Sequence, residues 1–181
     1  KGNSIELNTF KSEYDMIKEL AKNIKNDISI EKLNPSRDIL IVDLKGNKNR
    51  FEEEIGIYLK KLGINFYIPA QPNMNQHTCD WRYKKPDKFW CDNAVTISQT
   101  PRAKGNEAPM VYVVGIEQIA ENEQSIKERN KLFTAITRAK CWVKLMGVGN
   151  YELYDEIDKA ISSNGKFEFK FTKPKKETDD M

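Results

Sequence analysis

Continuous apolar runs alternate with amphipathic helical segments along most of this chain of 181 residues. The runs at 39–42 and 110–114 contain no charged residue, which is typical of strands buried on both faces of a sheet. Between the runs, apolar residues recur at helical spacing, as in 51–62. Because strands separated by helices pair in parallel, the pattern predicts an α/β fold with a largely parallel sheet flanked by helices.

The expected helices begin at residues that cap helices well. Ser12 with Asp15 and Ser125 with Glu128 form capping-box pairs, and Asn49 and Asn150 are further N-caps. We expect helices at 12–26, 49–62, 125–140 and 150–165. We expect strands at 39–42, 65–68, 95–97, 110–114, 141–146 and 167–171. The helix at 125–140 should turn its apolar residues inward, namely Ile126, Leu132, Phe133 and Ile136.

The length suits one domain. We expect residues 1–172 to form it, with an insertion at 70–92 and a charged, flexible tail at 173–181. The chain begins at Lys1 rather than Met, so we expect it to be a part of a longer protein.

Composition excludes several classes of protein. No apolar run approaches the roughly 20 residues of a membrane-spanning helix, so we expect no membrane contact. Lys and Arg number 30 against 27 Asp and Glu, a net charge of +3 that argues against purely electrostatic binding of nucleic acid. Three irregularly spaced Cys argue against a secreted disulfide scaffold. We expect a cytoplasmic protein, a monomer, with Cys141 in its core.

A charged turn over 99–107 follows the expected strand at 95–97, and ligands of parallel sheets commonly bind beyond the carboxyl ends of strands. Within it, Arg102-Ala103-Lys104-Gly105-Asn106-Glu107 combines two cations, a glycine and one carboxylate. This combination suits a nucleotide, whose ribose hydroxyl the acid could bind. The alternative is a solvated charged turn.

A second group of residues is Arg129 to Lys140. Arg138 lies near the end of the expected helix, directly before an apolar strand. From this position a guanidinium can reach a phosphate. The alternative is a cation that stabilises the carboxyl end of the helix through its dipole.

Together the two groups resemble motifs V and VI of superfamily 1 helicases of the UvrD/Rep type. Motif V in that family reads roughly T-x-H-x-A-K-G-x-E before an apolar strand, and this chain has Gln99-Thr100-Pro101-Arg102-Ala103-Lys104-Gly105-Asn106-Glu107. Motif VI reads roughly R-x-L-x-Y-V-A-x-T-R-A, and residues 129–139 match it in step at Phe133, Ala135, Thr137, Arg138 and Ala139. The order and the spacing of the two motifs agree with the family.

The resemblance implies that 1–172 is the C-terminal RecA-like domain, called 2A, a three-layer sandwich that binds ATP with Mg²⁺ jointly with an N-terminal RecA-like domain. Glu107 would bind the ribose and Arg138 the γ-phosphate, as an arginine finger, while Lys104 and Gly105 shape the turn. Lys11, in Thr9-Phe10-Lys11-Ser12, replaces the Arg of the family's N-Y-R-S segment, another γ-phosphate contact. Gln99, Thr100 and Arg102 would lie near single-stranded or partly duplex nucleic acid, although Gln99 and Pro101 depart from the family's Thr and His.

The phosphate-binding loop G-x-x-x-x-G-K-[ST] does not occur in residues 1–181, nor does an Asp-Glu pair after an apolar strand. In this family both belong to the N-terminal domain. We therefore expect the chain by itself to hydrolyse no ATP.

The insertion at 70–92 admits three interpretations. Trp81 and Trp90, with neighbouring Lys and Arg, could stack on bases of a single strand. The second is local packing of a long loop. The third is a metal site of His77, Cys79 and Cys91, but three ligands without CxxC spacing do not make a structural zinc site, and we expect no metal.

Two classes of function follow. One is the second motor domain of an ATP-dependent DNA or RNA helicase or translocase. The other is a non-catalytic RecA-like module that binds nucleic acid or a partner protein.

Overall fold

Six parallel strands form one sheet in the computed structural model, which describes residues 4–46, 49–69 and 88–163. The strands stand in the order β1-β6-β5-β2-β4-β3, and each neighbouring pair is parallel. They are β1 (Ile5–Phe10), β2 (Ile39–Asp43), β3 (Phe66–Tyr67), β4 (Val95–Gln99), β5 (Ala108–Val114) and β6 (Ala139–Val148). The predicted α/β fold with a parallel sheet is confirmed.

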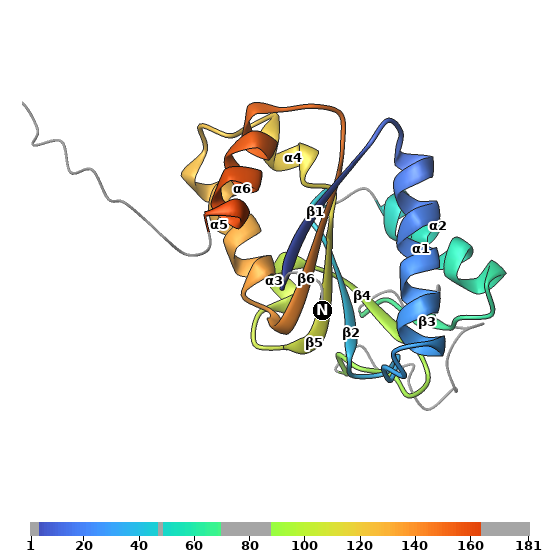
Figure 1. Ribbon diagram of the computed structural model, residues 1–181. Helices are drawn as coiled ribbons and strands as arrows, with labels where there is room; N and C mark the ends of the chain where they lie inside the picture. The colour runs from blue at the N-terminus through green and yellow to red at the C-terminus, as the bar shows by residue number, and fades with distance from the viewer. Residues whose placement is uncertain (1–3, 47–48, 70–87, 164–181) are drawn as a thin grey trace, which may run out of the picture.

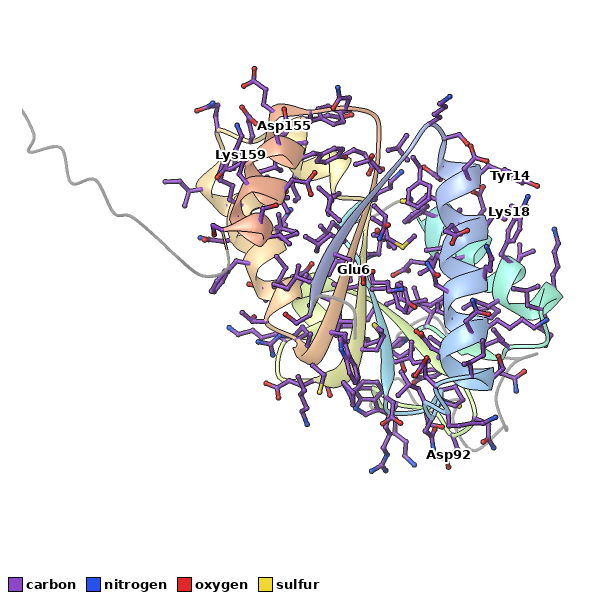
Figure 2. The ribbon with its side chains drawn as sticks, in the orientation of Figure 1. Glu6, Tyr14, Lys18, Asp92, Asp155 and Lys159 are labelled. Carbon is purple, nitrogen blue, oxygen red and sulfur yellow. The ribbon has the colours of Figure 1, made fainter. Side chains whose placement is uncertain are left out.

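Helices cover both faces of the sheet (Figure 1). One layer holds α1 (Glu13–Ser29) and α2 (Asn49–Lys61). The other holds α3 (Thr100–Ala103), α4 (Glu117–Ala120), α5 (Ile126–Ile136) and α6 (Glu152–Ser162). Figure 2 shows polar side chains on the outer surfaces of both layers, with Lys18 on α1 and with Asp155 and Lys159 on α6.

Two apolar clusters fill the spaces between the sheet and the helices. Met16, Leu20 and Ile24 of α1 are fully buried against one face, because they recur at helical spacing on its inner side. Val111 and Val113 of β5 pack on the other face beneath α5 and α6. All five residues of β2 are buried, as its continuous apolar run predicts.

The predicted helix starts at Ser12 and Ser125 are confirmed. Ser12 Oγ accepts a hydrogen bond from the backbone N–H of Asp15 at 3.2 Å, and Ser125 Oγ accepts one from Glu128 at 3.4 Å. The predicted cap at Asn150 is wrong: the N-cap is Tyr151, and its side chain makes no capping bond. Sequence reasoning missed β1, an edge strand with mostly half-buried residues, and α4, which has a single turn.

Helix α5 differs most from its prediction. It ends at Ile136 instead of continuing to about 140, because β6 already begins at Ala139. Two of its residues expected inward, Ile126 and Phe133, are 76% and 68% exposed, whereas Leu132 is buried. The inner face of α5 is therefore narrower than its apolar pattern suggests.

Further differences concern the segments around α3 and β6. The polar turn at 99–107 contains α3, and Cys141, expected in the core, is exposed. The predicted strand at 167–171, the tail at 173–181 and most of the insertion lie outside the described residues. Within the part of the chain that the structure describes, none of the helices combines the length and apolarity needed to cross a bilayer.

Candidate functional site at the two edges of the sheet

The residues expected to bind the nucleotide come together at the edge where β5 and β6 begin. The backbone N–H of Ala108 donates a hydrogen bond to the carbonyl oxygen of Arg138 at 3.0 Å. Glu107, next to Ala108, therefore lies beside Arg138, although 31 positions separate them in the sequence. The two motif-like segments thus adjoin at the amino ends of the strands rather than at the carboxyl ends we expected.

The segment before Glu107 crosses the sheet on the α5 side. It leaves β4 at Gln99, forms α3, and reaches the start of β5 after a turn. In this turn Gly105 has φ +86°, a left-handed conformation that favours glycine, and nothing lies within 4 Å of its missing side chain. Lys104 and Glu107 are exposed on the same turn, and among the described residues Glu107 makes no side-chain hydrogen bond or ion pair. Its carboxylate is available to a ligand.

The guanidinium of Arg138 folds back on the end of α5. Its Nε donates to the carbonyl oxygen of Thr134 at 3.1 Å, and its Nη2 donates to Thr137 Oγ1 at 3.2 Å. A cation in this position stabilises the carboxyl end of the helix, as the alternative interpretation of the sequence proposed. Both contacts are at a partly exposed site, so the side chain has room to rotate toward a ligand.

The structure does not bring Lys11 to this group. Lys11 follows β1 at the carboxyl edge, where Phe10 pairs with Val148 of β6. Arg138 precedes β6 by one residue, ten positions before Val148, so the two side chains lie roughly 30 Å apart along the sheet. The structure therefore does not join Lys11 to the group at the amino edge, and its role stays a prediction.

The residues expected to contact nucleic acid begin at the opposite, carboxyl edge. Gln99 ends β4, and its Nε2 donates to the carbonyl oxygen of Gly46 at 3.3 Å. Thr100 begins α3, and its buried Oγ1 has no hydrogen-bond partner among the described residues. Arg102 is exposed further along α3.

A shallow pocket of about 350 Å³ opens at the carboxyl edge, between the connection after β2 and the connection from α4 to α5. It is lined mostly by polar and charged residues, among them Lys45, Asn122, Ser125 and Lys131. The edge is therefore hollowed and polar rather than apolar.

The described part of the insertion packs against the core. The rings of Phe89 and Trp90 meet edge to face at 4.8 Å, and both contact the apolar cluster beneath α5 and α6. Cys91 is buried, while Trp81, His77 and Cys79 lie outside the described residues. In the three described ranges no three His, Cys, Asp or Glu side chains are arranged to hold a metal ion.

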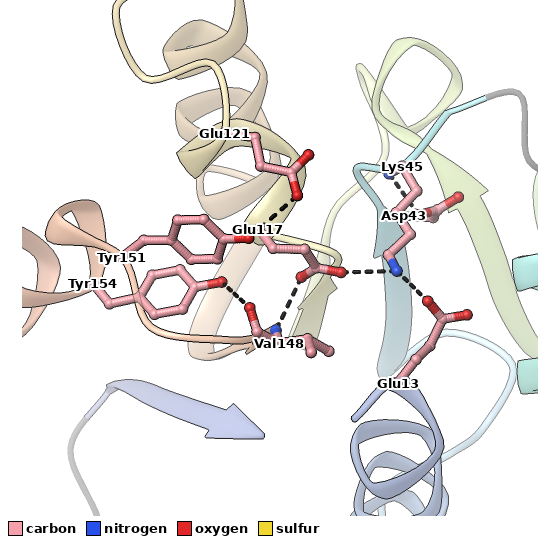
Figure 3. A network of polar contacts seen from close by, with 8 residues as sticks. All are labelled: Glu13, Asp43, Lys45, Glu117, Glu121, Val148, Tyr151 and Tyr154. Carbon is pink, nitrogen blue, oxygen red and sulfur yellow. Dashed lines mark hydrogen bonds and ion pairs between the residues drawn. The ribbon is translucent and has the colours of Figure 1, made fainter. Parts of the chain in front are cut away.

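Sequence reasoning missed a network of charges at the carboxyl edge (Figure 3). Lys45 Nζ forms ion pairs with Glu13 and Glu117, and the backbone N–H of Lys45 donates to Asp43 Oδ1 at 2.8 Å. Asp43 is 1% exposed and its Oδ2 has no partner among the described residues. Asp43 ends an apolar strand and Glu117 follows one. Their positions at the carboxyl ends of strands are the sequence signal from which both could have been predicted.

Burial raises the pKa of Asp43 to about 7, more than the backbone and ammonium of Lys45 lower it. Burial, with the neighbouring charge of Asp43, raises the pKa of Glu52 to about 7 as well. The folded protein therefore holds protons that the unfolded chain releases near pH 4. The contribution of Asp43 and Glu52 to the free energy of unfolding is therefore fully present below about pH 4, and it is lost as the pH rises to about 7.

We expect Asp43→Asn to stabilise the protein more at about pH 8 than at about pH 5, by at most about 2.5 kcal/mol. The amide keeps the acceptor for the N–H of Lys45 and removes the buried charge. Urea unfolding at the two pH values measures the difference. Asp155→Asn, at an exposed position of α6, should give the same stability change at both. A gain for Asp43→Asn that does not depend on pH would contradict the raised pKa.

Comparison with known proteins agrees with this architecture. Residues 94–146 match the family model of the UvrD-like helicase C-terminal domain, a range that includes the segment from Gln99 to Glu107 and Arg138. None of the curated proteins matches the chain.

Among solved structures, the C-terminal domain of a possible DNA helicase from Lactobacillus plantarum is similar, with 20% identity and a TM-score of 0.61 over 89% of this chain and 84% of that one. The helicase domain of Pyrococcus furiosus Hef is more distant, with 12% identity and a TM-score of 0.42 over 84% of this chain and 28% of that one. The resemblance to the C-terminal domain of UvrD-type helicases is thus confirmed, by the family match over residues 94–146 and by a fold shared with a helicase C-terminal domain.

Proposed function

We propose that this chain is the second motor domain of an ATP-dependent helicase or translocase. The observation that carries the proposal is the backbone hydrogen bond from Ala108 to Arg138, which holds Glu107 and Arg138 side by side. A free carboxylate next to a guanidinium matches a nucleoside triphosphate, whose ribose offers hydroxyl donors and whose phosphates attract the cation.

In this proposal each edge of the sheet binds a different ligand. The amino edge presents Arg138, Glu107, Lys104 and Gly105 to ATP with Mg²⁺, which an N-terminal RecA-like domain of the same protein holds. Gln99 and Thr100 at the carboxyl edge, with Arg102 further along α3, face nucleic acid in this proposal. Because the phosphate-binding loop is absent from residues 1–181, the chain by itself hydrolyses no ATP in this proposal.

The non-catalytic module remains the second candidate, and one observation favours it. Arg138 already satisfies two of its donors on its own helix, with Thr134 and Thr137. In such a module these bonds would persist when nucleotide is added, whereas a phosphate held by Nε and Nη2 would displace Thr134.

Glu107→Ala in the full-length protein is expected to weaken ATP binding about tenfold, since a hydrogen bond to a charged group contributes about 1.5–3 kcal/mol. Isothermal titration with ATP, 2′-deoxyATP and 3′-deoxyATP tests the assignment. The variant should bind ATP about as weakly as wild type binds the analogue lacking the contacted hydroxyl. Asp158→Asn, exposed on α6, serves as the control. Equal ATP affinity in Glu107→Ala and wild type would remove the ribose contact from the proposal.

A further inference from the structure

Lys45 connects three separate parts of the carboxyl edge through one ammonium group. It follows β2, and its Nζ lies 2.8 Å from Glu117 Oε1, at the start of α4, and against Glu13, at the start of α1 (Figure 3). The side chain is 11% exposed. A lysine so far from water is retained only where its charge is paired, and here both partners are carboxylates.

The surroundings of the side chain are shaped to hold it. Nζ lies 4.5 Å from the centre of the Phe51 ring, a cation–π distance. The stem passes Gly115, where a Cβ atom would come within 2.7 Å of Lys45 Cγ. Gly115 also has φ +81°, so this turn after β5 favours glycine both for its backbone and for the passing lysine.

The contacts of Lys45 continue to the remaining strands of this edge. Glu117 Oε2 accepts the backbone N–H of Val148, at the end of β6, at 3.1 Å. Gly46, the residue after Lys45, accepts the bond from Gln99 at the end of β4. The ends of β1, β2, β4, β5 and β6 are thereby linked around one cation.

Removing the ammonium would leave Glu13, Glu117 and Asp43 facing one another without a counter-charge. Like charges so close repel, and buried ones repel most strongly. The loops that carry them would separate, and Gly46 would no longer hold Gln99 in place. With both carboxylates bound, the ammonium has little free charge to offer to a phosphate.

We propose that Lys45 is a positioning residue: it fixes the loops of the carboxyl edge and so orients Gln99 for single-stranded nucleic acid, without contacting a phosphate itself. The role in binding rests on the function proposed above, whereas the fixing of the loops does not.

Binding of fluorescein-labelled oligothymidine by the 181-residue chain, measured by anisotropy at several salt concentrations, tests the role in binding. Lys45→Met should weaken binding about tenfold, the equivalent of one charge-assisted hydrogen bond. The slope of log affinity against log salt should stay as in wild type, because no phosphate contact is lost, whereas a direct contact would reduce it by about 0.7. Lys45→Arg should restore most of the affinity.

Hydrogen exchange without nucleic acid tests the fixing of the loops. Amides of 44–46 and 115–117 should exchange faster in Lys45→Met than in wild type. The control is Lys144→Met, which removes a half-buried lysine paired with Glu6 at 3.7 Å on the sheet face, and it should leave these amides unchanged. Glu117→Gln keeps an acceptor for Val148 and should give the same change to a smaller extent, which provides the test if Lys45→Met does not fold.

The outcomes separate the two proposals. Wild-type chain that binds no oligothymidine would contradict the proposed contact with nucleic acid, while the exchange data would still decide whether Lys45 holds the loops. Unchanged exchange in both variants would overturn the inference. Binding by Lys45→Met that equals wild type, or a salt slope lower by about 0.7, would overturn the role of Lys45 as a positioning residue.

Discussion

Arg138→Ala in the full-length protein should reduce ATP hydrolysis in the presence of nucleic acid by about 10³–10⁵-fold. Charge develops on the transferred phosphoryl group, and a positioned guanidinium neutralises it. Steady-state hydrolysis, with ATP affinity measured separately, checks this. Arg138→Lys should also lose most of the activity, because an ammonium lacks the planar fork that holds two phosphate oxygens.

The structure adds a condition to this prediction. Arg138 donates from Nε to Thr134 and from Nη2 to Thr137, so it must leave Thr134 before Nε and Nη2 together can hold a phosphate. Thr137→Val removes one of these bonds and should therefore preserve hydrolysis, which makes it a suitable control. Wild-type rates in Arg138→Ala would favour the non-catalytic module instead.

Gly147→Ala should destabilise the chain by about 2–5 kcal/mol, through overpacking and a lost hydrogen bond. Gly147 lies in β6, and a Cβ atom there would come within 2.4 Å of Ile116 Cγ1 and 2.5 Å of Tyr154 Oη. Ile116 and Tyr154 are both buried, and Tyr154 donates to the carbonyl oxygen of Val148 at 3.0 Å. Neither side chain can move without losing contacts.

Urea unfolding measures the loss of stability. Thr9→Ala is the matched control, because Thr9 pairs with Gly147 across β1 and β6 but is exposed, and it should change stability by about 0.5 kcal/mol or less. The double variant Gly147→Ala/Ile116→Ala should lose less stability than the sum of the losses in the two single variants, since the smaller side chain at position 116 makes room for the added Cβ atom. Additive losses would show that Ile116 is not the cause.

Much of the fold could be predicted from local patterns. The apolar run of β2 indicated a doubly buried strand, and Ser12 and Ser125 marked helix starts, because strand burial and N-capping depend on residues close in sequence. Strand β1 was missed because it lies at the edge of the sheet, where its residues are mostly half-buried and its polar positions are tolerated.

The sequence by itself determined the fold class, the order of the motif-like segments and the residue types that suit a nucleotide. Only the tertiary structure decided that Glu107 and Arg138 meet at the amino edge, that Lys11 lies at the other edge, and that Lys45 links the carboxyl ends of five strands. The physical reason is strand register. Hydrogen bonds between parallel strands join residues that are tens of positions apart, and no local period in the sequence encodes which of them become neighbours.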